Sequence, residues 1–160
     1  MYGYSIPKEG NTVSLLHVAF KYTNSLAKSL AEADASVANS EIRLFFVGIG
    51  SVFIKSDLNY GYLTPTQIPC KAQTGLVPNS GKAITCTVYP GSKPYIQVTN
   101  YNLVSPNTPI LIIIPKFTTP ADDFSVTIRL LTSVNGVYNE LANGAQTIVL
   151  NPEAGIGTLA

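Results

Sequence analysis

The run Phe124-Ser125-Val126-Thr127-Ile128-Arg129-Leu130 places an apolar side chain at every second position. Successive side chains of a β-strand point to opposite faces of a sheet, so this run predicts a strand with one apolar and one polar face. The chain then reaches Asn135-Gly136, a dipeptide that favours the tight turn of a hairpin. Val137 and Tyr138 would form the returning strand. This segment therefore predicts an antiparallel β-hairpin.

Strand patterns of this kind recur along most of the chain. They bring the expected total to about eight or nine short strands, a number typical of a β-sandwich or barrel. The further strands are expected at residues 13–22, 42–47, 51–55, 95–99 and 147–150. The sequence therefore predicts an all-β fold.

One segment departs from the strand pattern. Residues 25–35 are rich in Ala and Leu and contain neither Gly nor Pro. Leu26, Leu30 and Ala33 have the spacing of one helix face. We expect a short helical or irregular crossover between sheets near residues 25–36.

A chain of 160 residues is long enough for one domain with its own core. We expect residues 13–150 to form this domain, with an N-terminal extension at 1–12 and a C-terminal tail or linker at 151–160. Ends of this kind, if ordered, need a partner such as the sheet edge of a neighbouring subunit. The opening residues lack a signal-peptide pattern, so the chain is cytosolic, processed, or part of a longer protein.

Charged residues are sparse. They make up 12% of the chain, with a net charge of +1, against about 25% in an average globular protein. A polar but weakly charged surface suits a protein that is glycosylated or packs against copies of itself. Nucleic-acid binding needs clustered Lys and Arg and is not expected. No apolar run approaches the length of a membrane-spanning helix, so direct membrane insertion is not expected either.

The only two cysteines, Cys70 and Cys86, lie in β-rich segments on either side of a turn-forming stretch at residues 73–82. A hairpin-like loop would bring the two thiols together, and the resulting disulfide would stabilise the fold by about 3 kcal/mol. This interpretation implies an oxidising compartment. The alternative is a pair of buried thiols in a reducing cell. A zinc site is not expected, because the chain lacks a CxxC motif.

Residues that could carry catalysis are few. His17 is the only histidine, and its place in an alternating strand favours a structural role. Asp122-Asp123 is typical of a turn, and Asp57-Leu58-Asn59 is only a fragment of a calcium-loop pattern. There is no glycine-rich phosphate-binding motif. We therefore expect no enzymatic activity, no metal and no cofactor.

Tyrosines suggest a recognition surface. Tyr60 and Tyr62, together with Tyr89, Tyr95 and Tyr101, could form an aromatic platform for a sugar or a protein. Tyrosine also packs well on a pleated sheet, so an ordinary structural role is the alternative. No N-glycosylation sequon is present, although hydroxyls beside prolines in several loops allow O-glycosylation.

The segment Ile110-Leu111-Ile112-Ile113-Ile114 is apolar on both faces and bounded by Pro109 and Pro115. Such a strand must be covered on both sides, either by its own fold or by a neighbouring chain. One interpretation is a central core strand. The other makes Ile110, Ile112, Ile113 and Ile114 a candidate assembly strand.

The order of features between about residues 68 and 132 resembles a known family. In sequence these are Ile68-Pro69-Cys70, a Gly-containing loop, Ile84–Pro90, Ile96–Tyr101, the proline-flanked isoleucine strand and Phe124–Arg129. They resemble the immunoglobulin-like or cadherin-like β-sandwich modules of large protist (ciliate-type) cell-surface proteins. The resemblance implies an Ig-like β-sandwich in an extracellular, repeated, structural or adhesive setting. No binding or catalytic residue is carried over from it.

Two hypotheses follow for function. The leading one is an extracellular or cell-surface structural subunit that self-assembles through β-strand and apolar contacts into a filament or coat. The alternative is a cell-surface adhesion or recognition domain that binds a glycan or a surface protein. A secreted enzyme is a third hypothesis, disfavoured by the single histidine.

Overall fold

The computed structural model describes residues 2–4, 13–30, 37–48, 50, 52–53, 62–79, 81–118, 124–135, 137–141, 146–149 and 157–159. These residues form β-strands and contain no α-helix. The strands are β1 (Tyr2–Tyr4), β2 (Val13–Tyr22), β3 (Asn39–Val47), β4 (Thr66–Ile68), β5 (Lys71–Thr74), β6 (Thr85–Tyr89), β7 (Tyr95–Thr99), β8 (Ile110–Thr118), β9 (Ser125–Val134), β10 (Val137–Glu140), β11 (Gln146–Val149) and β12 (Gly157–Leu159).

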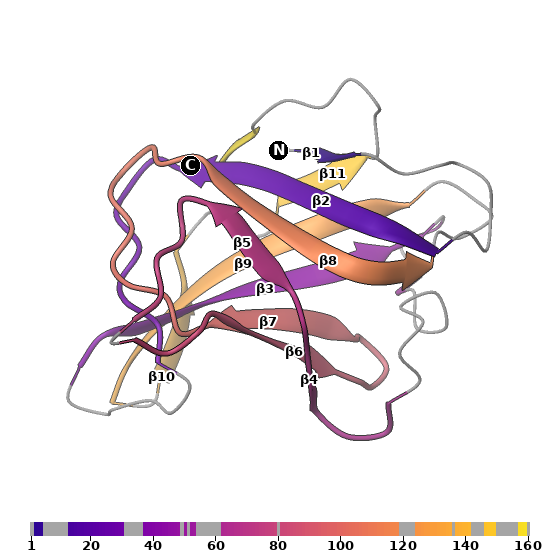
Figure 1. The fold of residues 1–160 in the computed structure, drawn as a ribbon, viewed down its shortest axis with the longest axis horizontal. Coiled ribbons are helices and arrows are strands. Elements are labelled where there is room, and N and C mark those ends of the chain that lie inside the picture. The colour runs from indigo at the N-terminus through magenta and orange to yellow at the C-terminus, as the bar shows by residue number, and fades with distance from the viewer. Residues whose placement is uncertain are drawn as a thin grey trace.

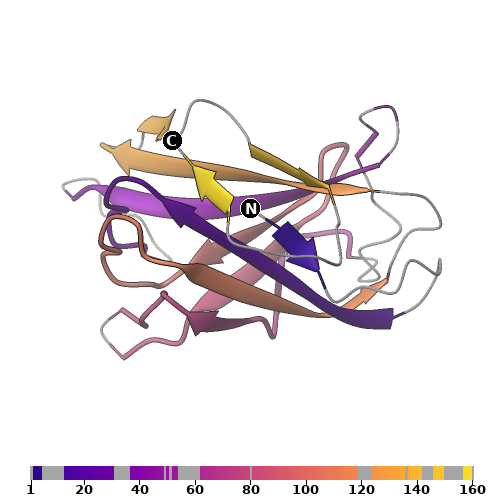
Figure 2. The ribbon, with the colours of Figure 1, turned by 90° about the horizontal axis from the view of Figure 1, so that it is seen from above.

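The strands form two sheets. The first has five strands in the order β1-β2-β8-β5, with β12 also paired to β2, and the second has seven in the order β10-β9-β3-β7-β6-β4, with β11 also paired to β9. In Figure 1, β2, β8 and β5 lie across β3, β9 and β7, and Figure 2 shows the same two layers from above. Neighbouring strands are antiparallel, except that β12 runs parallel to β2.

The predicted all-β sandwich is confirmed. The strands β1, β4 and β12 have three residues each, which leaves nine strands of four residues or more, in line with the expected eight or nine. An immunoglobulin-like strand order is not confirmed and stays a prediction.

The segment with the clearest alternation behaves as predicted. In β9, Val126, Ile128 and Leu130 are buried in the core between the sheets. β9 and β10 pair from Val134 and Val137 onward, so the Asn-Gly hairpin is formed. Asn135 has a φ of 56°, the left-handed conformation that such a turn requires and that Asn tolerates.

The isoleucine strand is central in its sheet. β8 lies between β2 and β5, and both neighbours are from the same chain. Ile110, Ile112 and Ile114 point into the core, where each stabilises the fold by about 1.5–3 kcal/mol, while Leu111 and Ile113 are half-buried on the outer face. The core-strand interpretation therefore explains Ile110, Ile112 and Ile114, whose side chains are buried within the fold. Only the outer face of β8, which carries Ile113, is open to contact with a second chain.

The connection from β2 to β3 is irregular. Residues 25–30 form no helix, because their backbone groups pair across the molecule instead: Leu26 exchanges hydrogen bonds with Val104, and the Ser29 N–H donates to the Tyr101 carbonyl at 2.8 Å. Leu26 is fully buried. The irregular form of the expected crossover is therefore confirmed for residues 25–30, whereas residues 31–36 lie outside the described part of the chain.

The predicted disulfide between Cys70 and Cys86 is formed, with the two Cα atoms 5.8 Å apart. Cys86 is a buried residue of β6, which pairs with β4. Cys70 lies in the connection that carries the chain from β4 in one sheet to β5 in the other. The bond therefore fastens a crossover between the sheets to β6.

Both chain ends contribute strands to the five-stranded sheet. β1 pairs with residues 17–19 of β2, and β12 pairs with residues 20–22 of the same strand. Residues 2–4 of the predicted extension and 157–159 of the predicted tail thus pair with their own chain. Among the described residues, no helix is long and apolar enough to cross a membrane.

Candidate functional site

The outer face of the seven-stranded sheet carries a cluster of aromatic and cationic side chains. Alternation places one side of β3, β7 and β9 in the core, so the residues between the core positions face outward. We call this cluster the aromatic–cationic face, and define it by Arg43, Phe45, Phe53, Tyr89, Lys93, Tyr95, Arg129 and Tyr138.

Aromatic rings form a continuous row across three strands. Phe45 of β3 lies opposite Tyr95 of β7, with ring centroids 5.1 Å apart, and Tyr95 stacks on Tyr89 of β6 at 4.9 Å. Phe53, which follows β3 and returns to it by a bridge with Val47, meets Phe45 edge-on at 5.9 Å. Strand register therefore brings together rings that are distant in the sequence.

Each cation of the face lies over an aromatic ring. The guanidinium carbon of Arg43 is 4.9 Å from the Tyr95 ring centroid, and that of Arg129 is 5.7 Å from the Phe45 centroid. The Lys93 ammonium is 5.8 Å from the Phe53 centroid. These distances lie within the range of cation–π attraction, worth about 0.5–1 kcal/mol at partly exposed sites.

Arg43 and Arg129 occupy directly opposed positions on β3 and β9. Like charges so placed destabilise a sheet. Each arginine has its own carboxylate: Arg43 donates to Glu41, and Arg129 donates to Glu140. The Glu41 side chain is 2% exposed and also accepts a hydrogen bond from Gln97, whereas the Glu140 side chain is 31% exposed.

Tyr95 stays uncharged at neutral pH. Burial raises the pKa of its hydroxyl above the ordinary value, and the nearby Arg43 guanidinium offsets only part of this rise. A protonated tyrosine keeps the electron-rich ring face that attracts Arg43.

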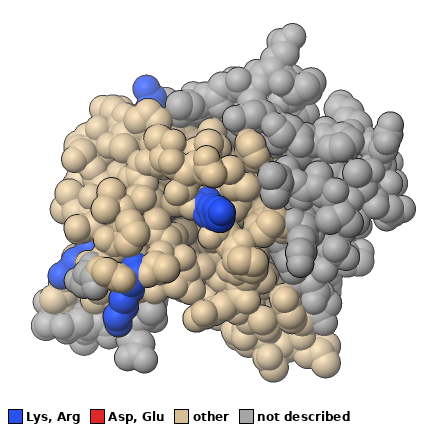
Figure 3. All heavy atoms as spheres, in the orientation of Figure 1, with Lys and Arg blue, Asp and Glu red and all other residues tan. Residues whose placement is uncertain are grey.

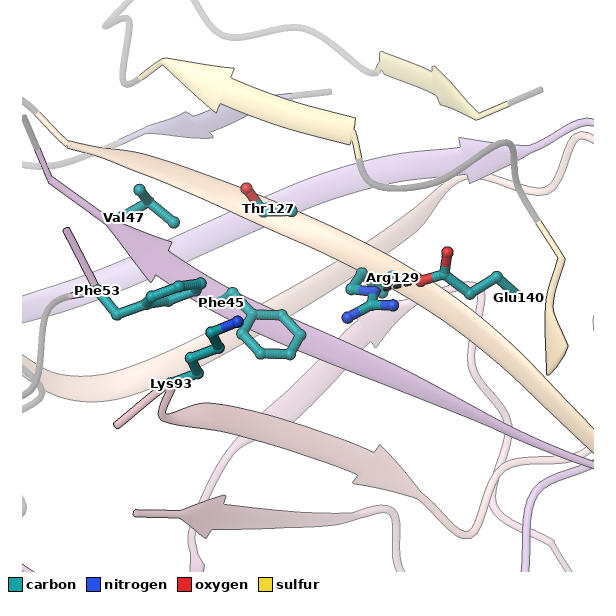
Figure 4. A pocket seen from close by; sticks show the side chains of 7 residues that line it. All are labelled: Phe45, Val47, Phe53, Lys93, Thr127, Arg129 and Glu140. Carbon is teal, nitrogen blue, oxygen red and sulfur yellow. Dashed lines mark hydrogen bonds and ion pairs between the residues drawn. The ribbon is translucent and has the colours of Figure 1, made fainter. Parts of the chain in front are cut away.

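The face is hollowed beside Phe45. A hollow of about 350 Å³ is lined by Phe45, Val47, Phe53, Lys93, Thr127, Arg129 and Glu140 (Figure 4). Figure 4 shows Phe45 and Phe53 side by side with the Lys93 side chain, and Arg129 joined to Glu140. Lys93 has no ion pair within the described part of the chain. The hollow therefore combines an apolar aromatic floor with a cation that forms no ion pair with any described residue.

The structure separates the tyrosines that the sequence grouped. Tyr89 and Tyr95 belong to the face, but Tyr101 is fully buried in the core, so its predicted place in an aromatic platform is wrong. Tyr62 is exposed but does not line the hollow, and Tyr60 lies outside the described residues.

Sequence reasoning missed the phenylalanines and the cations of the face. A signal was present, because the alternation that buries Ile42, Leu44 and Phe46 also places Arg43 and Phe45 together on the outward side. Their meeting with Arg129 and Lys93 depends on strand register, which the local pattern does not contain.

Other candidate residues form no comparable cluster. His17 lies in β2, paired with Ile113 of β8. The described residues contain no group of three or more His, Cys, Asp or Glu side chains that could hold a metal ion. Residues 57 and 122–123, named above as weak candidates, lie outside the described part.

No protein-family model matches the sequence, and neither a curated protein nor a solved structure shows significant similarity to it.

Proposed function

We propose that the protein is an extracellular recognition or adhesion domain that binds its ligand on the aromatic–cationic face. The observation that carries this proposal is the hollow of about 350 Å³, whose volume falls within the range of small-molecule sites and whose walls combine aromatic rings with cations. Aromatic floors with a few placed charged groups suit binding, since the rings supply contact area and the charges fix orientation.

The energetics of the face favour a binding role over a purely structural one. The like charges of Arg43 and Arg129 repel one another across β3 and β9, a cost that a neutral pair at the same positions would avoid. Local choices that oppose stability tend to occur at functional sites. The disulfide suits an oxidising, extracellular setting.

The test is a screen of the full chain, with its disulfide intact, against glycan and peptide arrays. We expect a bound ligand whose affinity falls about tenfold or more in Phe53→Ala, because one anchor of the hollow is lost. Tyr62→Ala is the matched control, since it removes an exposed ring outside the hollow. Thermal melts establish that both variants are folded. Loss of binding in the control alone would place the site elsewhere, and the absence of any ligand would refute the proposal.

A second candidate function is self-assembly into a surface filament or coat. It is favoured by β10, an end strand of the seven-stranded sheet in which all four residues are exposed. Val134 and Val137 are exposed and directly paired in this hairpin, and Tyr138 is exposed on the other face of the sheet. Charges are sparse on the face drawn in Figure 3, where the described surface shows isolated Lys or Arg side chains and no Asp or Glu. In β10 itself the one charged residue, Glu140, is paired with Arg129. The proposed partner is β10 of a second copy, paired edge to edge.

Light scattering over a range of concentrations tests this candidate. A charge at the edge blocks strand pairing, so Val137→Lys should abolish association. Val77→Lys is the matched control, because Val77 has the same exposure, 61%, and its backbone pairs with Asn102 and not with β10. A wild-type chain that stays monomeric at high concentration would exclude the assembly function.

A further inference from the structure

The geometry points to a carboxylated sugar, of the uronic-acid or sialic-acid type, as the ligand of the hollow. This inference rests on the proposed recognition function and names its ligand class. It is drawn from the charge, the floor and the backbone pairing of the hollow.

The charge balance calls for an anion. Of the residues that the structure describes, two cations and one carboxylate line the hollow. Arg129 is paired with Glu140, which leaves the positive charge of Lys93 in excess among them. Lys93 is exposed, and a neutral ligand would take water from its ammonium without giving it an ionic partner. A ligand carboxylate beside Lys93 and Arg129 would instead form charge-assisted hydrogen bonds, the stronger kind.

The floor calls for an apolar ligand surface. Phe45, Phe53 and Val47 make up one side of the hollow, and inorganic phosphate or another compact anion would leave these surfaces uncovered. A pyranose ring presents C–H groups on one face and hydroxyls at its rim. It can therefore cover an aromatic ring while its carboxylate reaches a cation.

A peptide fits this floor less well, because the floor offers no backbone group for strand addition. Phe45 pairs with Tyr95 on one side and Thr127 on the other. Thr127 in turn pairs with Thr147 of β11. A peptide bound here would lose the main-chain hydrogen bonds that usually anchor an extended chain on a sheet, whereas a sugar requires only side-chain contacts.

The experiment uses two pairs of probes that differ only in charge: methyl glucuronide against methyl glucoside, and methyl sialoside against its methyl ester. Each is titrated into the full chain, and amide chemical shifts are followed by NMR. We expect at least one acid to bind about tenfold more tightly than its neutral partner. The shifts should map to Phe45, Thr127 and Arg129, which belong to the hollow.

Variants separate the contribution of charge from that of the rings. Lys93→Met should reduce the preference for the acid, because Arg129 alone is left to bind the carboxylate, and an unchanged preference would overturn the role of Lys93. Phe53→Ala should weaken the acid and its neutral partner alike. Lys82→Met is the matched control, because Lys82 is also an exposed lysine. It lies in a turn with Asn79, whose backbone bonds to Asn100. Asn100 follows the end of β7, whereas Lys93 precedes its start.

Failure of this inference is distinguishable from failure of the proposed function. Equal binding of the acid and the neutral sugar at the hollow would show that the carboxylate is not recognised. The proposed recognition function would still stand. Binding of an acidic peptide, such as acetyl-Phe-Glu-Glu, without any sugar would overturn the sugar class. If sugars and peptide alike leave the amides of the hollow unshifted, both proposals are wrong.

Discussion

Replacing the two opposed arginines one at a time should destabilise the fold to very different extents. Arg129→Thr and Arg43→Thr each remove one of two like charges that face one another across β3 and β9, and each introduces a residue favoured in strands. The variants differ in the carboxylate left behind. Glu140 is 31% exposed and is solvated when Arg129 is lost, whereas Glu41 is 2% exposed and keeps only its hydrogen bond from Gln97 when Arg43 is lost.

The expected changes in the free energy of unfolding follow from the exposure of the two carboxylates. For Arg129→Thr, the lost ion pair costs about 0–1 kcal/mol and the lost contact with Phe45 costs about 0.5–1 kcal/mol. Relief of the like-charge pair offsets about 0.2–1 kcal/mol of this. The free energy of unfolding should therefore fall by less than about 2 kcal/mol. Arg43→Thr strands a buried carboxylate and should lower it by about 3 kcal/mol.

Urea unfolding measures both values, with tyrosine fluorescence as the signal because the chain contains no tryptophan. Affinity for the carboxylated sugars is measured on the same samples, and Arg129→Thr should weaken it about tenfold while the fold is retained. A loss of more than about 2 kcal/mol in Arg129→Thr would show that Arg129 is chiefly structural. Equal losses in the two variants would refute the argument from carboxylate burial.

Three further predictions concern the scaffold, and each is checked by the same unfolding measurement. Tyr101→Phe should lower stability by about 1 kcal/mol, because the buried Tyr101 hydroxyl lies 2.8 Å from the Ser40 hydroxyl; no change would mean that this contact contributes nothing. Gly75→Ala should destabilise the fold more than Gly81→Ala: both glycines have positive φ, but only at Gly75 would a Cβ meet a backbone atom, the Pro109 carbonyl oxygen. Reduction of the disulfide under native conditions should cost about 3 kcal/mol, and an unchanged midpoint would contradict its proposed role in fastening the crossover.

Much of the fold could be predicted, because a local period of two is sufficient to identify a strand. Val126, Ile128 and Leu130 alternate with polar residues in the sequence and are buried in the structure. The Asn-Gly turn and the Cys70–Cys86 pair were likewise predictable, since turn conformation and loop closure depend on nearby residues. The helical spacing of residues 26–33 was misleading where the structure describes it. There, backbone hydrogen bonds to residues 101 and 104 replace those within a helix.

The candidate site was much harder to predict from the sequence than the fold. Tyr89 and Tyr95 were named among the tyrosines, but so was Tyr101, which the structure buries. Nothing in the local pattern distinguishes an outward tyrosine from one whose hydroxyl finds a partner inside the core. Tyr101 is buried because Ser40 supplies that partner from a distant segment.

By itself, the amino-acid sequence determined the β-strands, their apolar faces, one hairpin and one disulfide, since each depends on the order of neighbouring residues. Only the tertiary structure decided that Arg43 lies opposite Arg129, and that Phe53 and Lys93 meet beside Phe45. The reason is physical. Strand order and register are set by the combined packing of the whole core, and a shift of one residue would turn these side chains to the other face.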